Sequence, residues 1–230
     1  MQVKNIISGS EEKLRNKEYI IGVGISLGNK FFSLENILEY INFSLIYSKS
    51  NVIVYVADSI HSYNIEVRSR VSRQKSLDIA VMKGKELLKM VEIACESYNF
   101  EEKSRIKFVS WTEIEDKEDY KMMMDFVFKY YESNLDFKRE LQYITRSLVS
   151  KEARFFDYDD IETFNKYFLS ELPELLTRVK IGKYNCDAFV CPYESDFTKL
   201  SACIQNGIKY HELQLNIVDK FLPKVCIILN

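Results

Sequence analysis

Ser26 is the best-placed nucleophile in this sequence. It follows a short apolar run and stands in the segment Gly-Val-Gly-Ile-Ser-Leu-Gly at residues 22–28. A buried strand that ends in a glycine-flanked serine places the hydroxyl at the carboxyl end of the strand, where open α/β sheets bind their ligands. A serine at such a turn can also do no more than cap the next helix, and position alone leaves both interpretations open.

One way to activate this hydroxyl is a catalytic triad. Residues 24–28 match the Gly-x-Ser-x-Gly pattern of a nucleophile elbow, and the chain order Ser26, Asp187, His211 is permitted for an α/β hydrolase. The chain has only two histidines, so His61 and His211 are the only imidazole bases available. In hydrolases several strands precede the elbow, whereas a single predicted strand precedes Ser26. A serine hydrolase or esterase is therefore kept as an alternative.

A second way to activate Ser26 uses a carboxylate and a phenol. Tyr167 and Glu171 are four residues apart, which places them on one face of a helix. Apolar neighbours such as Leu169 and Leu172 would partly desolvate the glutamate and raise its pKa toward a range that is useful for proton transfer. Taken alone, the pair also fits a solvated glutamate and a tyrosine at a helix edge.

The glycines around Ser26 do not form a dinucleotide-binding motif. Gly22, Gly24 and Gly28 are spaced one residue too widely for Gly-x-Gly-x-x-Gly. The nearest acidic residue after the second predicted strand, Asp58, follows Gly28 by 30 residues rather than about 20. A nonenzymatic binding module of Rossmann type is kept as a further alternative.

Five short apolar runs are predicted strands, because their β-branched and aromatic residues fit parallel strands that are covered on both faces. Helical stretches separate them. We therefore expect one α/β, Rossmann-like domain over residues 1–230, with a five-stranded, mainly parallel sheet and helices on both faces. Ser33 is the expected N-cap of the first helix. The predicted strands cover residues 19–25, 52–57, 105–110, 188–191 and 225–229, and the predicted helices cover residues 33–47, about 70–98, about 118–148, 159–179 and about 210–222.

The composition is that of a soluble globular protein, with 47% hydrophobic and 29% charged residues and a net charge of −2. No run of about 18 apolar residues is present, so we expect no membrane association and a cytoplasmic location. Five cysteines without a paired spacing predict free thiols, and we expect no metal and no cofactor. Residues 1–17 are expected to be a peripheral or poorly ordered N-terminus.

Two segments together resemble the signatures of the cyclodipeptide synthases. Residues 20–26 read Ile-Ile-Gly-Val-Gly-Ile-Ser, similar to the family's His-x-aliphatic-aliphatic-Gly-aliphatic-Ser, with Ile20 at the histidine position. Residues 167–173 are similar to its Tyr-aliphatic-x-x-Glu-x-Pro, with Phe168 at the aliphatic position. Asn29, three residues after the serine, matches a further family position. The two signatures occur in the family's order, and with the strand–helix order the resemblance covers nearly the whole chain.

The resemblance implies a fold like the catalytic domain of class I aminoacyl-tRNA synthetases, without ATP chemistry or a cofactor. It implies that two aminoacyl-tRNAs are joined into a cyclic dipeptide by ping-pong catalysis through an aminoacyl-enzyme on Ser26. Tyr167 and Glu171 are then expected to hold the α-ammonium group of the first amino acid. The late catalytic tyrosine is matched best by Tyr193, with Tyr210 as a rival.

Three further residues are expected to contact the first amino acid. Asn29 is expected to hold the backbone or the carbonyl oxygen of the acyl group. Gly24 is expected to let the acyl side chain approach the strand. Gly22 removes a side chain from the same wall, which predicts a roomier first pocket.

A basic segment after the second predicted strand is expected to contact the tRNA, as the resemblance implies for a basic helix in this region. Residues 68–90 carry seven basic side chains against two acidic ones, in a chain with a net charge of −2. Apolar residues such as Ala80 and Leu88 fall on one side of a helical wheel and the lysines roughly opposite. A basic outer face suits contacts to phosphates, although an ordinary solvated lysine face has the same pattern. The basic residues are Arg68, Arg70, Arg73, Lys75, Lys83, Lys85 and Lys89.

Overall fold

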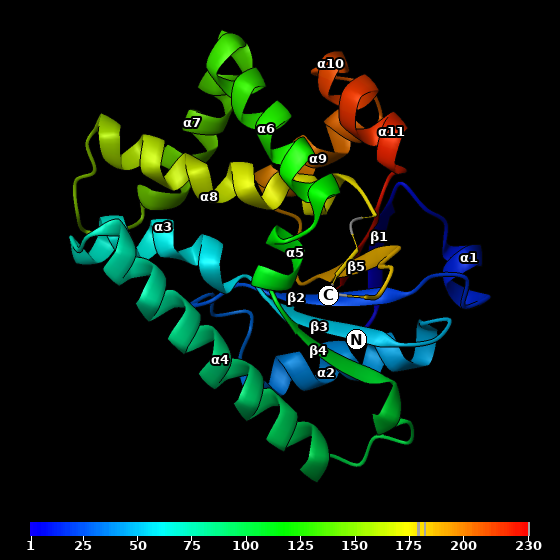
Figure 1. Ribbon diagram of the computed structural model, residues 1–230. Coiled ribbons are helices and arrows are strands. Elements are labelled where there is room, and N and C mark those ends of the chain that lie inside the picture. Colours follow the sequence, from blue (N-terminus) through cyan, green and yellow to red (C-terminus); the bar gives the residue numbers. More distant parts are fainter. Residues whose placement is uncertain (179, 182, 230) are drawn as a thin grey trace.

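The computed structural model describes residues 1–178, 180–181 and 183–229. In this part of the chain six strands form one sheet in the order β1-β6-β5-β2-β3-β4 (Figure 1). The strands from β6 to β4 pair in parallel, and β1 runs antiparallel along β6. The expected α/β, Rossmann-like architecture is confirmed. The strands are β1 (Val3–Ile7), β2 (Ile21–Ile25), β3 (Val52–Val56), β4 (Ile106–Ser110), β5 (Ala188–Cys191) and β6 (Val225–Leu229).

The strand at the N-terminus, β1, corrects the expected number of strands from five to six. The segment expected to be peripheral or poorly ordered forms this edge strand and then the short helix α1 (Glu11–Arg15). Residues 4 and 5 of β1 are exposed, since an edge strand has only one neighbour and little to bury. Its sequence therefore lacks the continuous apolar run by which the five buried strands were predicted.

The helices differ from the expected ones mainly at their ends. Ser33 caps α2 as expected, its hydroxyl accepting from the N–H of Asn36. The expected helix over residues 118–148 is two helices, because Asn134 ends α6 and its side chain then caps α7. The helices α1, α3, α5 and α9 were not expected. The further helices are α2 (Leu34–Tyr47), α3 (Asp58–Ser69), α4 (Arg73–Ser97), α5 (Thr112–Glu115), α6 (Glu118–Ser133), α7 (Leu135–Val149), α8 (Tyr158–Leu176), α9 (Asp196–Gln205), α10 (His211–Leu213) and α11 (Asp219–Phe221), with a 3-10 turn at Lys103–Arg105 and a π-helical turn at Gln214–Val218.

The two faces of the sheet are covered by different helices, as Figure 1 shows. Side chains alternate between the faces along each strand. Val23 and Val54 pack on the face that α2 and α4 cover. Ile53, Tyr55 and Phe189 pack on the opposite face, with residues of α6, α8 and α9. Residues of β2 that share the second face are therefore directed toward α8. None of the helices within the described ranges is long and apolar enough to cross a membrane.

Candidate active site

A cavity of about 630 Å³ lies at the carboxyl ends of β2, β3 and β5. The strand order places β2 between β3, which follows it in the chain, and β5, which returns to its other side. This reversal is where open α/β sheets form a ligand-binding crevice. The predicted site residues that line the cavity are Gly24, Ser26, Asn29, Arg68, Tyr167, Glu171 and Tyr193.

The phenol of Tyr167 lies between the hydroxyl of Ser26 and the carboxylate of Glu171. Its oxygen is 3.4 Å from Ser26 Oγ and 3.4 Å from Glu171 Oε1. Because the phenol donates its single proton to Glu171, Ser26 is the donor in the contact with Tyr167. Both contacts are long for O–H···O hydrogen bonds. They nevertheless connect a nucleophilic hydroxyl to a carboxylate in one cavity.

Burial sets the protonation of this group. It raises the pKa of Glu171 to about 8, and the neighbouring carboxylate of Glu174 adds to the shift. Burial also raises the pKa of the Tyr167 phenol well above its ordinary value, with a further contribution from Glu171. The phenol is therefore a proton donor at neutral pH, and Glu171 titrates close to the range in which an amine nucleophile operates.

Tyr193 and Asn29 lie in the same cavity wall. Tyr193 follows β5, and its ring packs against that of Phe31 with the ring centres 4.5 Å apart. The side-chain oxygen of Asn29 accepts from the N–H of Phe31 at 3.1 Å. Burial raises the pKa of Tyr193, and the side chain of Asn29 opposes that shift. Since the two residues share Phe31, the loop after β2 and the end of β5 form one side of the site.

Tyr210, the rival for the late tyrosine, lies elsewhere. Its hydroxyl donates to Glu140, and its ring packs edge-on against Phe137 with the ring centres 5.0 Å apart. It does not line the cavity. Of the two candidates, Tyr193 is therefore the one within the site.

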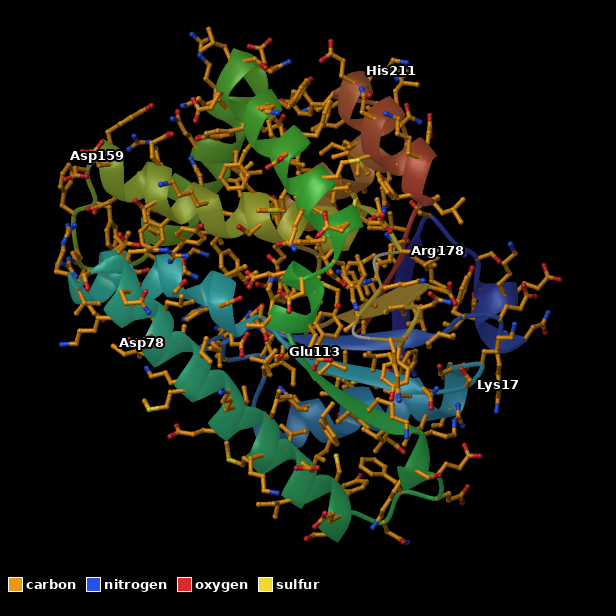
Figure 2. The ribbon with its side chains drawn as sticks, in the orientation of Figure 1. Lys17, Asp78, Glu113, Asp159, Arg178 and His211 are labelled. Atoms are coloured by element: carbon orange, nitrogen blue, oxygen red, sulfur yellow. The ribbon has the colours of Figure 1, made fainter. Side chains whose placement is uncertain are left out.

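The residues of the expected hydrolase triad are not brought together. Asp187 accepts from the backbone N–H of Ile20 at 3.0 Å and pairs with Arg178 at 3.4 Å. His211 begins α10 on the outside of the molecule, where it contacts Gln214 at 2.9 Å (Figure 2). Neither Asp187 nor His211 lines the cavity around Ser26. The arrangement excludes this triad as the means of activating the serine.

The two glycines of β2 make room for Tyr55 of β3. A Cβ on Gly22 would lie 2.9 Å from Tyr55 Cε1 and 2.7 Å from Cys186 Sγ. A Cβ on Gly24 would lie 3.0 Å from Tyr55 Oη. The expectation of a roomier pocket is corrected here: Gly22 does not line the cavity, and the space that it leaves is filled by the Tyr55 ring and the Cys186 thiol.

The cavity also contains charged and polar residues that the sequence did not reveal. Glu174 lines it and forms a buried ion pair with Lys224, with 3% and 0% of the two side chains exposed. Tyr55 donates to the same carboxylate at 2.5 Å. Glu174 lies three residues after Glu171, which places both on one face of α8. This spacing could have predicted that Glu174 also belongs to the site. Lys224 lies just before a strand, and no pattern marks it.

His61, which is not among the predicted site residues, also lies in the cavity wall. Its ring lies edge-on to that of Tyr167, with the ring centres 6.3 Å apart. Burial lowers the pKa of His61 to about 4, and the cations Arg68 and Lys83 contribute. The imidazole is therefore neutral at physiological pH. The described residues hold no group of three or more His, Cys, Asp or Glu side chains that could bind a metal ion.

The predicted basic residues divide into two sets. The three arginines form ion pairs: Arg68 with Glu152 at 2.7 Å, Arg70 with Asp160, and Arg73 with Glu66 at 3.7 Å. Arg70 ends α3 in a left-handed conformation, and Ser72 then caps α4, so the expected helix begins at Arg73. The lysines are exposed on α4. Lys89 pairs with Glu92 at 3.3 Å, whereas Lys75, Lys83 and Lys85 form no ion pair with any residue of the described ranges.

The sequence matches a known family over most of its length. The family model described as cyclodipeptide synthase matches residues 2–207. The chain belongs to this family. Cyclodipeptide synthases are enzymes that transfer aminoacyl groups, so the chain is an aminoacyltransferase, and the alternative of a nonenzymatic binding module is wrong. No protein with curated annotation matches the chain.

Solved structures of cyclodipeptide synthases share the fold. One from Bacillus thermoamylovorans is 21% identical with a TM-score of 0.73, covering 96% of this chain and 91% of its own. A Mycobacterium tuberculosis protein, reported to demonstrate that cyclodipeptide synthetases are related to type I tRNA synthetases, is 14% identical with a TM-score of 0.65, covering 87% and 86%. An enzyme from Candidatus Glomeribacter gigasporarum, solved bound to Phe-tRNAPhe, is 15% identical with a TM-score of 0.51, covering 91% and 88%. At these identities the likeness shows the fold alone.

Proposed function

We propose that this cyclodipeptide synthase makes a cyclic dipeptide from two aminoacyl-tRNAs by ping-pong catalysis through an aminoacyl group on Ser26. The observation that carries the proposal is the contact chain from Ser26 through Tyr167 to Glu171 in one cavity. It supplies a hydroxyl that can carry an acyl group and a carboxylate that can hold its α-ammonium. The related structure bound to Phe-tRNAPhe supports aminoacyl-tRNA as the substrate class.

The first step is a transesterification. Ser26 Oγ attacks the ester carbonyl of the first aminoacyl-tRNA, and the bond to the terminal ribose oxygen breaks. The proton of the serine ends on the released tRNA hydroxyl, with the ribose hydroxyl beside the ester as the proton shuttle. An ester is a reactive acyl donor, so the step needs no strong base beside Ser26. Asn29 holds the acyl group during this step, and Glu171 holds its α-ammonium.

The second step forms the peptide bond. The carboxylate of Glu171 accepts a proton from the α-ammonium, whose neutral amine attacks the ester of the second aminoacyl-tRNA. The second tRNA leaves with a proton from the attacking nitrogen, and a dipeptidyl-enzyme remains on Ser26. The raised pKa of Glu171, about 8, matches it to an α-amino group, which has an ordinary pKa of about 8.

The last step closes the ring. The free amine of the dipeptide attacks the ester on Ser26, the C–O bond breaks, and the proton of the amine passes to the serine oxygen. Tyr193 lies in the cavity wall and keeps its proton because burial raises its pKa. We assign it the relay of that proton. The product is a diketopiperazine, and the site is ready for another cycle once Glu171 has released its proton to water.

The tRNA is held by the exposed lysines of α4. This helix has 25 residues, so it extends for about 37 Å along the outside of the molecule (Figure 1). Lys75, Lys83 and Lys85 are exposed on it and available to phosphates. The ion pair between Arg68 and Glu152, both of which line the cavity, fixes the end of α3 next to the reaction site. Since aminoacyl-tRNAs are made in the cytoplasm, we place the reaction there.

Product analysis tests the function. Cells that express the chain should release a cyclic dipeptide into the medium without an added cofactor, detected by mass spectrometry, and cells that express the folded Ser26→Ala variant should not. Absence of a cyclic dipeptide, both from cells and from purified protein supplied with a full set of aminoacyl-tRNAs, would contradict the proposal. Turnover of a chromogenic ester in its place would favour hydrolase chemistry.

A further inference from the structure

A buried ion pair lies one helical turn from the proposed ammonium site. Tyr167, Glu171 and Glu174 are at positions i, i+4 and i+7 of α8, so all three face the cavity. Oε1 of Glu174 accepts from the hydroxyl of Tyr55 at 2.5 Å and from the ammonium of Lys224. Its other oxygen, Oε2, accepts no hydrogen bond from any residue that the structure describes. The carboxylate therefore has acceptor capacity left over in a cavity wall.

The side chain of an acyl group on Ser26 can reach the Glu174 carboxylate. Gly24 lies on β2 and Ser26 directly follows the last residue of that strand, and both line the cavity. Gly24 carries no side chain, and Tyr55 Oη lies 3.0 Å from where its Cβ would be. An acyl group on Ser26 whose α-ammonium is at Glu171 thus has its side chain directed over Gly24, toward the Tyr55 hydroxyl and Glu174.

The chemistry of this wall restricts the side chain that fits it. An apolar side chain would bury the open oxygen of Glu174 without a donor, which costs the desolvation of that group. A charged side chain of either sign would be buried here without a counter-charge, because Glu174 and Lys224 already neutralise each other and Glu171 is assigned to the α-ammonium. The remaining class is a neutral side chain with a hydrogen-bond donor at its end.

Apolar side chains and the indole ring of Trp111 also line the cavity. Trp111, Leu175 and Phe189 are each at most 7% exposed. We propose that Glu174, held by Lys224 and Tyr55, selects a first amino acid whose side chain has an apolar body and a neutral O–H or N–H donor at its tip, with tyrosine as the best match. The inference rests on the proposed function, because it assumes that the acyl group is carried on Ser26.

The test compares one tRNA body charged chemically with tyrosine or with phenylalanine, which differ only in the hydroxyl. The rate of adduct formation on the enzyme is followed by intact-protein mass spectrometry. Tyrosine should react at least about tenfold faster, because a site built to bond a hydroxyl rejects the analogue that lacks it. Equal rates, or a faster reaction with phenylalanine, would overturn the inference.

The variant Glu174→Leu/Lys224→Met removes both charges together, so no buried charge is left unpaired. It should lower the tyrosine-to-phenylalanine ratio to about 1 or below. A ratio that stays at the wild-type value would overturn the inference. Should this variant fail to fold, Tyr55→Phe replaces it, since loss of the hydroxyl frees Glu174 to rotate. That change should lower the ratio at least threefold, and an unchanged ratio would again overturn the inference.

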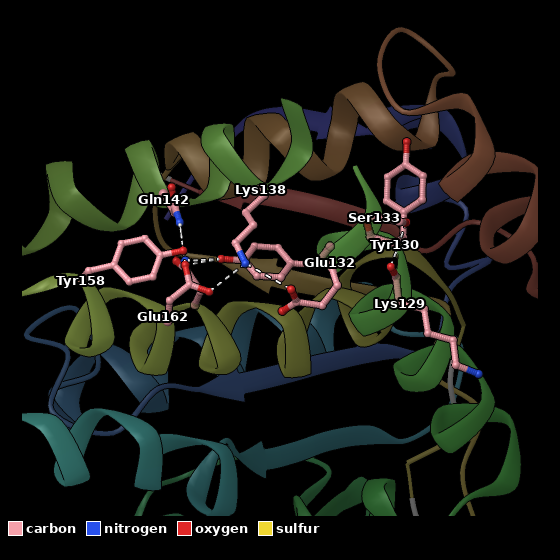
Figure 3. Close-up of polar contacts among 10 residues, drawn as sticks. Lys129, Tyr130, Glu132, Ser133, Lys138, Gln142, Tyr158 and Glu162 are labelled. Atoms are coloured by element: carbon pink, nitrogen blue, oxygen red, sulfur yellow. Dashed lines mark hydrogen bonds and ion pairs between the residues drawn. The ribbon is translucent and has the colours of Figure 1, made fainter. Parts of the chain in front are cut away.

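The chain provides a matched control on the same helix. Figure 3 shows Glu162 of α8 beside Lys138, with which it pairs at 3.2 Å. Glu162 also accepts from Tyr131 at 2.9 Å, and it does not line the cavity. Glu162→Leu/Lys138→Met therefore removes a Glu–Lys pair outside the cavity, one that is partly exposed, and should leave the ratio unchanged. A ratio that falls equally in this control would count against the inference. If wild-type protein forms no adduct with any aminoacyl-tRNA, the proposed function fails, whereas adducts at equal rates overturn this inference alone.

Discussion

Ser26 Oγ lies 3.4 Å from the phenolic oxygen of Tyr167, although the two residues are 141 positions apart in the sequence. The contact exists because β2 ends at the carboxyl edge of the sheet and α8 passes over that edge. Tyr167 lies on the face of α8 that is directed to the cavity. The same phenol donates to Glu171. Nucleophile and carboxylate are therefore coupled through one hydroxyl group, and the proposed reaction depends on this coupling.

Loss of the Glu171 carboxylate should separate the two halves of the reaction. Glu171→Gln keeps the size of the side chain but can accept no proton from the α-ammonium. We expect the aminoacyl-enzyme still to form and the yield of cyclic dipeptide to fall at least about 100-fold, the usual effect of losing a general base. Adduct and product are both measured by mass spectrometry. Wild-type amounts of product from Glu171→Gln would refute this role.

Glu171 should also make stability depend on pH. Its pKa is about 8 in the folded protein and 4.5 ordinarily, so between these values the folded state binds more protons than the unfolded state. The free energy of unfolding therefore falls as the pH rises through that window. Glu171→Gln removes this contribution. Its stability relative to wild type, from urea unfolding at pH 5 to 9, should rise up to about pH 8 and then level off.

Glu162→Gln is the control for this measurement, because the pKa of Glu162 is shifted in the opposite direction and lies below the measured pH range. Burial raises the pKa of Glu162, but hydrogen bonds from Gln142, Tyr131 and Lys138 outweigh burial, and the net pKa is below 4.5. The ionised Glu162 carboxylate therefore stabilises the folded protein above pH 4.5. This contribution is lost as the pH falls through the folded-state pKa. Parallel stability curves for wild type and Glu171→Gln between pH 5 and 8 would contradict a raised pKa for Glu171.

Gly22 should tolerate no side chain. Gly22→Ala places a Cβ 2.7 Å from Cys186 Sγ and 2.9 Å from the Tyr55 ring, both of which are buried and closely packed. We expect this change to lower the free energy of unfolding by about 1–3 kcal/mol, as overpacking does. Gly24→Ala, with its nearest contacts at 3.0 Å, should cost less. Equal stability of wild type and Gly22→Ala in urea would contradict the position of Tyr55.

The lysines of α4 should determine how tRNA binding depends on salt. Lys83→Glu/Lys85→Glu should weaken binding and lower the slope of log Kd against log salt by about 1 for each phosphate that is no longer bound. The control Lys13→Glu/Lys17→Glu makes the same change of charge at Lys13 of α1 and at Lys17, which follows that helix. Figure 2 shows Lys17 on the side of the molecule opposite Asp78 of α4. An equal change of slope in both variants would show that α4 has no specific role.

The sequence allowed the central part of the site to be predicted because its signals are local. A strand that ends in Gly-Ile-Ser and a helix with Tyr167 and Glu171 one turn apart each identify a residue from its own neighbours. The strands of the buried sheet were predictable for the same reason. Their continuous apolar runs reflect burial on both faces.

The features that were missed depend on contacts distant in sequence. Lys224 is buried because Glu174, 50 residues away, neutralises it, and nothing in its own segment indicates that pairing. Gly22 was interpreted as an opening in the pocket because the Tyr55 ring that fills the space comes from the next strand. Two helices were predicted as one because a single side chain, Asn134, ends the first and caps the second.

The sharpest test of the mechanism is the mass of the enzyme after it has been mixed with an aminoacyl-tRNA. The wild-type chain should gain the mass of one aminoacyl group, and Ser26→Ala should gain none. Ser195→Ala, which changes another serine of the cavity wall, should still form the adduct. An adduct on Ser26→Ala at the wild-type level, or wild-type amounts of cyclic dipeptide from that variant, would contradict the assignment of Ser26 as the nucleophile.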